Sequence, residues 1–330
     1  MLPYIVRRIL LAIPTLFVVS LISFILIQLP PGSFLDDYAA QLAQQGEQVS
    51  NEQLIALKAA YGLDQPSYVQ YYKWMKGILT KGDFGLSFEW NLPVSRLIWD
   101  RMGFTLGLTV STLIFTWLLA IPIGVYSATH QYSKLDYLFT TFGFFGLGIP
   151  GFMLALALMW IAFSYFGQDV GGLFSRPFEN APWSLAKIVD MFKHLWIPIV
   201  ILATEGTASL IRIMRANLLD ELHKPYVTSA RSRGLAERRL VWEYPTRVAL
   251  NPFVSSAGFA LPELINGATI ISVVLSLPTA GPLLLNALTA QDMYLAGAFI
   301  LLIGSLTIIG VLISDILLAW LDPRIRYGAR

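Results

Sequence analysis

Four long stretches of this chain contain no Asp, Glu, Lys, Arg or His, namely residues 9–29, 102–128, 137–168 and 293–314. Each is at least as long as the roughly 20 residues that cross a bilayer core as a helix. Two further stretches carry a single acid each, Glu205 in about 195–211 and Glu263 in about 253–277. In lipid a backbone must satisfy its own hydrogen bonds, and a helix does so. The sequence therefore predicts an all-α polytopic membrane protein with six transmembrane helices.

The basic residues between these stretches are unevenly distributed. Fourteen of the 23 Lys and Arg residues share one side of the predicted topology: Arg7, Arg8, Lys134, eight between Arg212 and Arg247, and Arg324, Arg326 and Arg330. Cytoplasmic loops collect Lys and Arg, so we expect both termini inside the cell, N-in and C-in. The first stretch is longer than the apolar region of a signal peptide, and we expect it to be retained.

Composition divides the chain into three parts. Residues 1–30 are the first transmembrane helix, 31–101 an extracytoplasmic segment, and 102–330 a core of five transmembrane helices with a cytoplasmic loop at about 215–250. Within 31–101 we expect a short helix, then a Pro-initiated helix from about Gln65, and a turn at Gly82-Asp83. This segment is either a small cap packed on the helices or a docking surface for an extracytoplasmic partner.

Proline occurs within several of the predicted helices, among them at Pro14, Pro122, Pro150 and Pro262. Proline removes a backbone hydrogen bond and can kink a helix. Membrane helices tolerate this where neighbours or water satisfy the freed carbonyl. Most such prolines are packing features, and a minority line a moving pathway.

Several kinds of chemistry are excluded by composition. The chain has no cysteine, which rules out disulfides, thiolate metal sites and cysteine nucleophiles. Its histidines lie in three separate segments, at His130, His194 and His223, and indicate no metal cluster. A Gly-x-x-x-x-Gly-Lys-Ser/Thr phosphate loop is also absent from the sequence, so we expect no ATP hydrolysis and no cofactor on this chain.

Charge is concentrated in one stretch, YVTSARSRGLAERRLVWEY (226–244), with four arginines and two glutamates. Pro225, just before it, suits the first turn of a helix, because the amide that it lacks would have no partner there. Gly234 suits the left-handed residue after a helix end. A second helix is predicted from Ala236 until Pro245. The sequence therefore predicts a short helix, a tight turn and a basic helix.

One face of the first short helix is narrow. Tyr226, Ala230 and Gly234 follow at a spacing of four and so share that face. The residues alone fit either close approach to a partner or a solvated basic loop attracted to anionic lipid.

The same stretch resembles a known family. Tyr226-Val227, Ala230-Arg231 and Arg233-Gly234-Leu235 stand where the pattern Tyr-Val-x-x-Ala-Arg-x-Lys-Gly-Leu has its defined positions. That pattern is typical of permease subunits of ATP-binding-cassette importers of the dipeptide/oligopeptide/nickel class. In such permeases this element is the coupling helix, which sits in a groove of the ATPase subunit. Thr228 and Ser229 depart from the general Glu-Ala-Ala motif but fit the peptide subclass.

The resemblance extends over nearly the whole chain. It includes MLPYIVRRILLAIPTLFVVSLISFILIQLPPG at the N-terminus, YGLDQPSYVQYYKWMKGILTKGDFGLSF in the external segment, and LSLPTAGPLLLNAL and LDPRIRYG in the last third. Family members usually have Glu-Thr-Val-Phe before Ser-Leu-Pro-Gly. Here the first run is Ser272-Val273-Val274-Leu275, and Thr279 replaces the glycine. These departures put the exact substrate in doubt rather than the family.

The resemblance implies the type I importer permease fold, with half of a translocation pathway, in the bacterial cytoplasmic (inner) membrane. Besides the lipid bilayer, the implied partners are a second permease subunit in a heterodimer, two ATPase subunits that bind ATP and Mg, and an extracytoplasmic solute-binding protein. No nucleic-acid partner is implied. Peptides fit the subclass best as cargo, and oligosaccharides, opines or nickel complexes are the alternatives.

For contact with the ATPase, we expect Tyr226 and Leu235 to supply apolar docking. Ala230 and Gly234 are expected to allow a close fit. Arg231 is expected to meet a carboxylate of the ATPase.

Ionisable groups inside spans are costly and tend to be functional or paired. Glu263, Asn266, Gly267 and Ile270 lie on one face of a helix that starts near Asn251-Pro252, and Glu205 lies beside Thr204, Thr207 and Ser209. Glu263 either attracts the ammonium group of a solute or hydrogen-bonds a neighbouring helix. The pathway candidates are therefore Glu263, Asn266, Glu205 and Ser272.

Three other classes of membrane protein fit the sequence less well. A secondary transporter or channel would show inverted repeats or charge networks across several spans. An intramembrane enzyme would need paired catalytic groups, and Asp315 alone does not qualify. A structural adaptor would not require six helices interrupted by proline and glycine.

Overall fold

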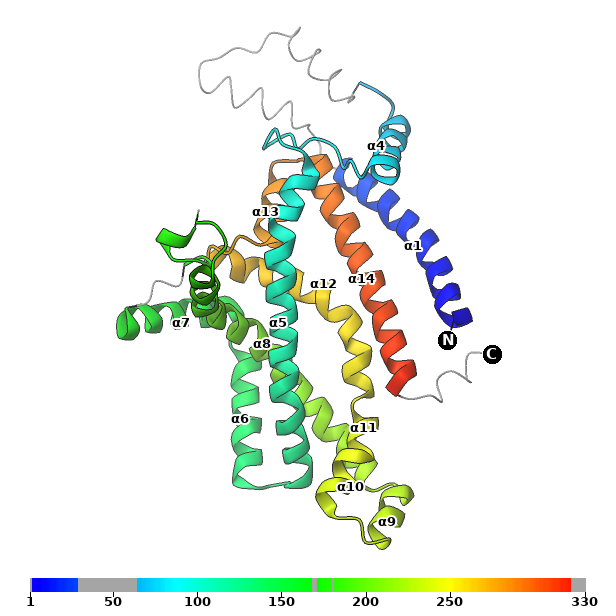
Figure 1. Ribbon diagram of the computed structural model, residues 1–330, viewed down its shortest axis with the longest axis vertical. Helices are drawn as coiled ribbons and strands as arrows, with labels where there is room; N and C mark the ends of the chain where they lie inside the picture. The colour runs from blue at the N-terminus through cyan, green and yellow to red at the C-terminus, as the bar shows by residue number, and fades with distance from the viewer. Residues whose placement is uncertain (1, 29–63, 168–170, 180, 322–330) are drawn as a thin grey trace. The chain divides into compact units, whose positions relative to one another are not determined.

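The structure, a computed structural model, describes residues 2–28, 64–167, 171–179 and 181–321, without the side chains of 2–5, 26–28, 259–262 and 264–266. Helices dominate these residues, which form one isolated bridge, between Leu86 and Pro93. The elements labelled in Figure 1 are α1 (Leu2–Gln28), α4 (Ser67–Lys81), α5 (Val94–Thr129), α6 (Lys134–Gly148), α7 (Gly151–Phe166), α8 (Leu185–Leu222), α9 (Pro225–Ser232), α10 (Glu237–Glu243), α11 (Pro245–Ala249), α12 (Asn251–Val274), α13 (Ala280–Thr289) and α14 (Met293–Leu321). A short 3₁₀ helix, η1 (Arg176–Phe178), lies between α7 and α8.

The chain forms two compact units. The larger unit comprises Met1–Arg8, Phe104–Thr279 and Leu306–Arg330, and the smaller unit comprises Ile9–Gly103 and Ala280–Ser305. Each unit has its own packing, described below.

Four of the described helical segments are long and apolar enough to cross a membrane: Val6–Ile25, Val94–Thr129, Leu185–Leu222 and Met293–Leu321. They coincide with four of the predicted spans, although α8 extends well beyond the predicted 195–211. At 1.5 Å per residue, α8 is about 57 Å long and exceeds the apolar thickness of a bilayer. The predicted span 253–277 corresponds to α12. The number of six crossings stays a prediction.

The predicted span 137–168 is not one straight helix. The structure divides it into α6 and α7, whose axes differ by 105°. The break has a local cause: Pro150 disfavours helical geometry at the residue before it, and Ile149 is extended, with φ −97° and ψ 120°. α7 then starts at Gly151. This pair is either a broken span or a re-entrant loop.

Two hydrophobic clusters hold the larger unit together. One joins α5, α7, α8 and α12 through residues such as Leu108, Ala155, Ile201 and Ile271. The other joins α5 and α8 to the short helices α9, α10 and α11 and to the start of α12, through residues such as Ala120, Met214, Val227, Leu240 and Phe253. The short helices are therefore fixed to the long ones by a continuous apolar core.

Helices α12 and α14 approach each other closely in the larger unit. A Cβ atom placed on Gly258 would lie 2.7 Å from the carbonyl oxygen of Gly310, and one on Gly310 would lie 2.4 Å from that of Gly258. The Ser314 hydroxyl donates a hydrogen bond to the carbonyl of Val254 one turn further along. Only glycine fits at this crossing.

In the smaller unit, α4 packs on α1. The Tyr71 hydroxyl lies 2.7 Å from the Ser20 hydroxyl, and the Phe24 ring contacts the rings of Tyr71 and Trp74. The start of α4 after Pro66 and its end at Gly82, with φ +64°, confirm the predicted Pro-initiated helix and turn. The short helix predicted before it lies outside the described residues.

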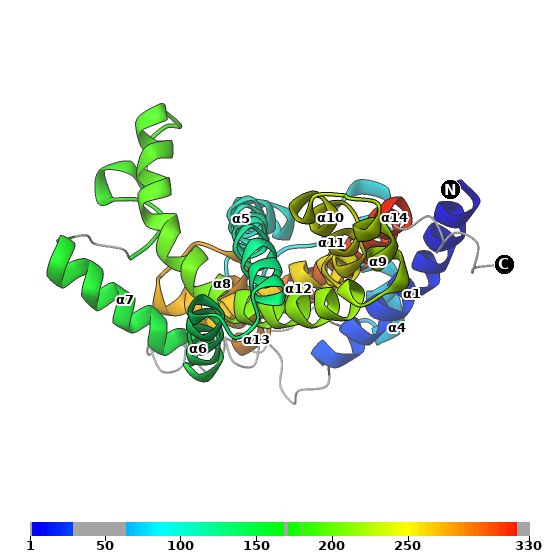
Figure 2. The ribbon, with the colours of Figure 1, turned by 90° about the horizontal axis from the view of Figure 1, so that it is seen from below.

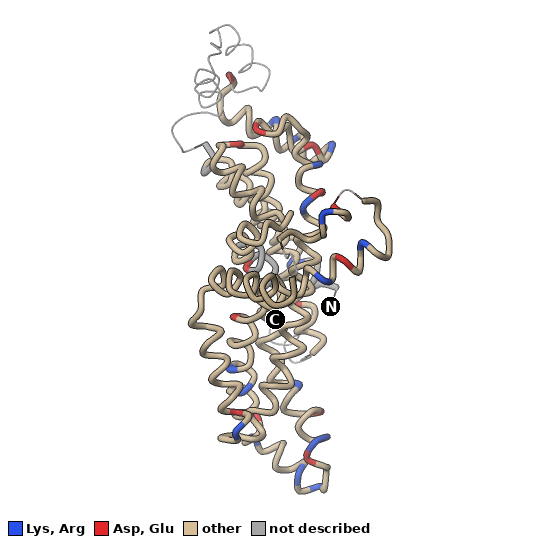
Figure 3. Tube along the Cα trace, turned by 90° about the vertical axis from the view of Figure 1, so that its left-hand side faces the viewer, with Lys and Arg blue, Asp and Glu red and all other residues tan. Residues whose placement is uncertain are grey.

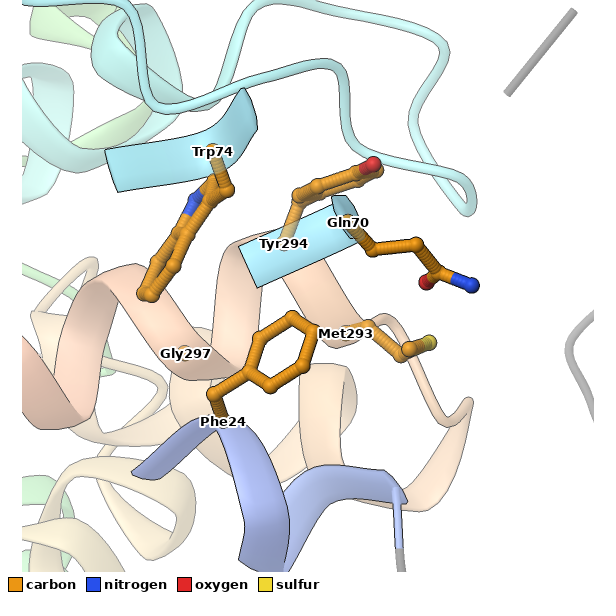
Figure 4. A pocket seen from close by; sticks show the side chains of 6 residues that line it. All are labelled: Phe24, Gln70, Trp74, Met293, Tyr294 and Gly297. Atoms are coloured by element: carbon orange, nitrogen blue, oxygen red, sulfur yellow. The ribbon is translucent and has the colours of Figure 1, made fainter. Parts of the chain in front are cut away.

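A single carboxylate fixes the loop that follows α4. Asp292 accepts hydrogen bonds from the Ser87 hydroxyl at 2.5 Å, from the Glu89 amide at 3.3 Å and from the Leu295 amide at 3.1 Å. It therefore caps α14 and anchors residues 87–89. Beside it, Phe24, Trp74, Met293 and Tyr294 surround a small apolar pocket (Figure 4). This packing ties α4 and its loop to α1 and α14.

Candidate functional site

The charged stretch folds as predicted from sequence. α9 begins with Pro225 and ends at Ser232, Gly234 has φ +78°, and α10 follows over Glu237–Glu243. α9 and α10 lie together with α11 at one end of the larger unit (Figures 1 and 2). We call residues 225–243 the α9–α10 module.

The inner face of the module is packed against its own chain. Val227 and Leu240 are fully buried, and Ala230 and Val241 are nearly so. All four belong to the cluster that includes Met214 of α8. Movement of this module would therefore be transmitted to α5 and α8, because close-packed interiors do not deform freely.

This burial revises the expected role of Ala230. Its small side chain fits the core of its own chain rather than an outer surface. Tyr226, which shares its helical face by spacing, is 40% exposed. Leu235 is partly buried against the same core. Among the expected docking residues, Tyr226, Arg231 and Gly234 are the exposed ones.

Hydrogen bonds organise the exposed side of the module. The Tyr226 hydroxyl donates to Glu221 at 2.6 Å, and partial burial together with this bond raises the pKa of Tyr226. Arg231 donates to both carboxylate oxygens of Glu237, at 3.0 and 2.6 Å. The bond from Arg231 lowers the pKa of Glu237. The predicted carboxylate partner of Arg231 thus has an intramolecular competitor.

Gly234 stands at the turn between the two helices. A Cβ atom there would meet nothing within 4 Å. Its positive φ is therefore the only intramolecular reason for glycine, because other residues adopt that backbone conformation at a cost in free energy. A side chain at this position would project away from the chain.

Two exposed aromatic residues were not selected from the sequence. Trp242 is 45% exposed on α10 and Tyr244 is 42% exposed directly after it. Large aromatic side chains at an exposed polar surface are typical of protein interfaces. Their place on either side of Glu243, just after the arginines of α10, is the signal that could have identified them. In Figure 3, blue and red segments gather at this end of the larger unit.

A buried ion pair braces the neighbouring turn between α5 and α6. Asp136 is 3% exposed and lies 3.2 Å from the guanidinium of Arg215 on α8. It also accepts the Tyr132 amide at 3.0 Å. The start of α6 is thus tied to the same part of α8 that carries the module.

The two acids among the pathway candidates face outward. Glu205 on α8 and Glu263 on α12 are exposed, and neither forms a hydrogen bond or ion pair with a described residue. Gly267 and Ile270 continue the exposed face of Glu263, as the spacing predicts. The side chain of Asn266 lies outside the described residues.

Ser272 does not share that face. It lies nine residues after Glu263, about half a turn away around the helix axis. Its side chain is fully buried, and its hydroxyl has no hydrogen-bond partner in the described structure. The structure therefore separates Ser272 from the outward acids. Among the described residues, no group of three or more His, Asp or Glu could hold a metal ion.

Comparison with known proteins gives consistent matches. Residues 120–327 match the family described as binding-protein-dependent transport system inner membrane component, and residues 1–109 match the N-terminal family of the same membrane components. The oligopeptide transport system permease protein AppB of Bacillus subtilis is 35% identical over 326 residues, which cover 98% of this chain and 99% of AppB. OppB of Haemophilus influenzae is 32% identical, with 99% and 100% covered. The dipeptide transport system permease protein DppB of Alkalihalophilus pseudofirmus is 30% identical, with the same coverage.

Proposed function

The chain belongs to the family of inner membrane components of binding-protein-dependent transport systems, and from this we propose that it carries peptides and is driven through its α9–α10 module. The family makes it a multi-pass inner membrane protein and a permease subunit of an ATP-binding-cassette importer. Such a transport system includes a solute-binding protein and an ATPase.

Peptides are the proposed cargo because the relatives are named for oligopeptide and dipeptide transport. The names of these relatives give no support to oligosaccharides, opines or nickel complexes. Family membership likewise gives no support to a secondary transporter or channel.

The proposed assembly contains this chain, a second permease subunit and two ATPase subunits. ATP and Mg bind to the ATPase subunits, and this chain holds neither. The solute-binding protein delivers peptide from outside the cell. With both termini inside, the α9–α10 module lies on the cytoplasmic side, where it can reach the ATPase.

The proposed coupling is mechanical. ATP-driven closure of the ATPase subunits displaces the module, and its buried face transfers this displacement to α5 and α8 through Met214 and Leu218. The outer face, with Tyr226, Arg231, Gly234 and Trp242, contacts the ATPase. Coupling of this kind requires that the module docks differently in the two states of the transporter.

One observation carries this proposal: the module is buried on one face and exposed on the other. Gly234 offers a test, because a side chain there contacts nothing within the chain. Gly234→Glu should leave the protein in the membrane but abolish peptide uptake and co-purification of the ATPase. The added carboxylate is bulky and charged at the docking surface.

Gly234→Ala is the matched control. It pays the same backbone cost for positive φ, of about 1–2 kcal/mol, but adds only a methyl group. We expect it to retain ATPase binding and most of the uptake. Undiminished uptake by Gly234→Glu would refute the coupling role, and equal losses in both variants would assign the effect to backbone strain.

A further inference from the structure

A second polar site lies in the larger unit, away from the α9–α10 module. It is a pocket of about 840 Å³ between the loop that follows α7 and the first turns of α8. That loop and the start of α8 lie side by side in Figure 2. The lining residues used below are Phe174, Arg176, Glu179, Lys193, His194 and Trp196.

Buried charges on α8 hold the loop in place. Asp190 accepts hydrogen bonds from the amide and the hydroxyl of Ser175, at 2.7 and 2.6 Å. Lys187 is 6% exposed and donates to the carbonyls of Glu179 and Ala181, at 3.2 and 2.7 Å. Its ammonium also lies 4.7 Å from the centre of the Phe174 ring. Buried charges are costly in a membrane helix. The presence of Asp190 and Lys187 at this position therefore indicates that the loop is held in one defined conformation.

The anchored loop presents opposite charges at the pocket. Arg176 and Glu179 are exposed, and their side chains form no ion pair with a described residue. Lys193 adds a second positive charge from α8. The pocket therefore offers cationic groups for an anion and a carboxylate for a cation.

His194 contributes an acceptor. It is 4% exposed, and its Nδ1 lies 2.8 Å from the carbonyl oxygen of Asp190. In the neutral ring, Nδ1 donates to that carbonyl and Nε2 is left as an acceptor. Nε2 has no partner among the described residues. A ligand with an N–H donor would satisfy it.

An apolar stripe on α8 adjoins the pocket. Its residues are exposed and follow the i, i+3, i+4, i+7, i+11 pattern of one helical face: Leu185, Ile188, Val189, Phe192 and Trp196. α8 is one of the candidate membrane spans. The stripe meets the charged pocket at Trp196, which also lines it. A ligand that matches both surfaces has a zwitterionic head and a long apolar tail.

We propose that this pocket binds the headgroup of a phospholipid that carries a primary ammonium, of the phosphatidylethanolamine type. Arg176 and Lys193 contact the phosphate, Glu179 and His194 accept from the ammonium, and the acyl chains lie along the stripe. Such bonds to a charged group are stronger than neutral ones. A soluble peptide could match the charges but would leave the stripe uncovered.

The test measures lipid retention by the intact transporter complex with native mass spectrometry, independently of ATP and peptide. Three probes with identical acyl chains are added: phosphatidylethanolamine, phosphatidylcholine and phosphatidylglycerol. Phosphatidylethanolamine should be retained best, because the choline headgroup has no N–H donor and the glycerol headgroup has no cation. Arg176→Gln should weaken its retention about tenfold, the loss of one charge-assisted contact.

Matched variants separate this site from general effects. Lys73→Gln removes an exposed charge on α4 and should change nothing, and Arg176→Lys should restore most of the retention. Glu179→Gln should remove the preference for ethanolamine over glycerol headgroups. Equal losses in Arg176→Gln and Lys73→Gln, or equal retention of choline and ethanolamine lipids, would overturn the proposal. Displacement of the lipid by a tripeptide would assign the pocket to a soluble ligand instead.

Discussion

On α9, Val227 and Ala230 are buried in the chain's own core, whereas Tyr226 and Arg231 are exposed beside it. The residues of this short helix thus divide between a face buried in the core and a face open to a partner. Arg231 is already bound to Glu237, so a carboxylate on the ATPase would have to replace that partner. Both side chains are largely exposed, and exposed ion pairs contribute little to stability. Replacing Glu237 by a carboxylate of the ATPase as the partner of Arg231 would therefore cost little free energy.

Glu263 is one of the two acids among the pathway candidates. It is exposed on α12 and bonds to no described residue, so its contact with solute stays a prediction. Glu263→Gln should reduce uptake of peptides with a free ammonium group about tenfold and leave N-acetylated peptides less affected. Competitive uptake assays with matched peptides measure this difference.

The control for Glu263 is Asp100→Asn on α5, which removes an exposed acid from a residue with no assigned role and should leave uptake unchanged. Unchanged uptake of all peptides by Glu263→Gln would retire the pathway role of this residue.

Helices α12 and α14 cross at Gly258 and Gly310 with no room for a side chain on either glycine. A methyl group on Gly258 would lie 2.7 Å from both the carbonyl oxygen of Gly310 and Cα of Val311. Gly258→Ala should therefore destabilise the protein by about 1–3 kcal/mol through overpacking. The thermal unfolding midpoint in detergent measures this effect.

Gly267→Ala, on the same helix, provides the comparison. Its Cβ would meet nothing within 4 Å, and alanine is a better helix former than glycine. We expect an unchanged or higher midpoint for this variant. Equal unfolding midpoints for Gly258→Ala and Gly267→Ala would show that the close crossing does not contribute to stability.

The loop after α4 depends on Asp292, the buried cap of α14. Burial raises the pKa of Asp292, although bonds from Ser87, Leu295 and Glu89 lower it in part. A carboxyl group whose pKa is higher in the folded state favours folding most when it is protonated. This contribution is complete below the ordinary value of 3.8 and is lost as pH rises through the folded-state pKa.

The stability of the protein should therefore contain a component that weakens as pH rises above the ordinary carboxyl value of 3.8. Asp292→Asn should lack this component, because an amide does not titrate. Midpoints measured for both proteins at pH values below and above 3.8, and subtracted, isolate the contribution of Asp292. A difference that is flat or rises with pH would contradict the assignment.

The sequence predicted elements well where a local rule decides them. Pro225 and Gly234 bound α9 as expected, and Pro66 and Gly82 bound α4, because helix ends follow from backbone geometry at single residues. The break between α6 and α7 also has a local cause at Pro150, but its angle of 105° depends on packing. Periodicity identifies a helical face and does not say what covers it.

On the scale of the whole molecule, contacts between distant segments were beyond sequence reasoning. Spacing placed Ala230 on the face of Tyr226, but only the packed structure shows that Ala230 faces Met214 and the core. Asp292 and Ser87 are 205 residues apart, and no local pattern connects them. The resemblance identified the family, whereas the roles of individual side chains depended on three-dimensional burial.

The central claim for the whole molecule is that an ATPase subunit binds the α9–α10 module. The chain has no cysteine, so a single introduced thiol can carry a photocrosslinker without background from this subunit. Ser229→Cys places it on the exposed side of α9, and Ser67→Cys places it on the exposed start of α4. Both variants are assembled with their partner subunits in native membranes.

Illumination should join Ser229→Cys to the ATPase subunit, with a yield that changes on addition of ATP, and should not join Ser67→Cys to it. Adducts of Ser229→Cys with lipid alone, or equal ATPase adducts from both positions, would contradict the account.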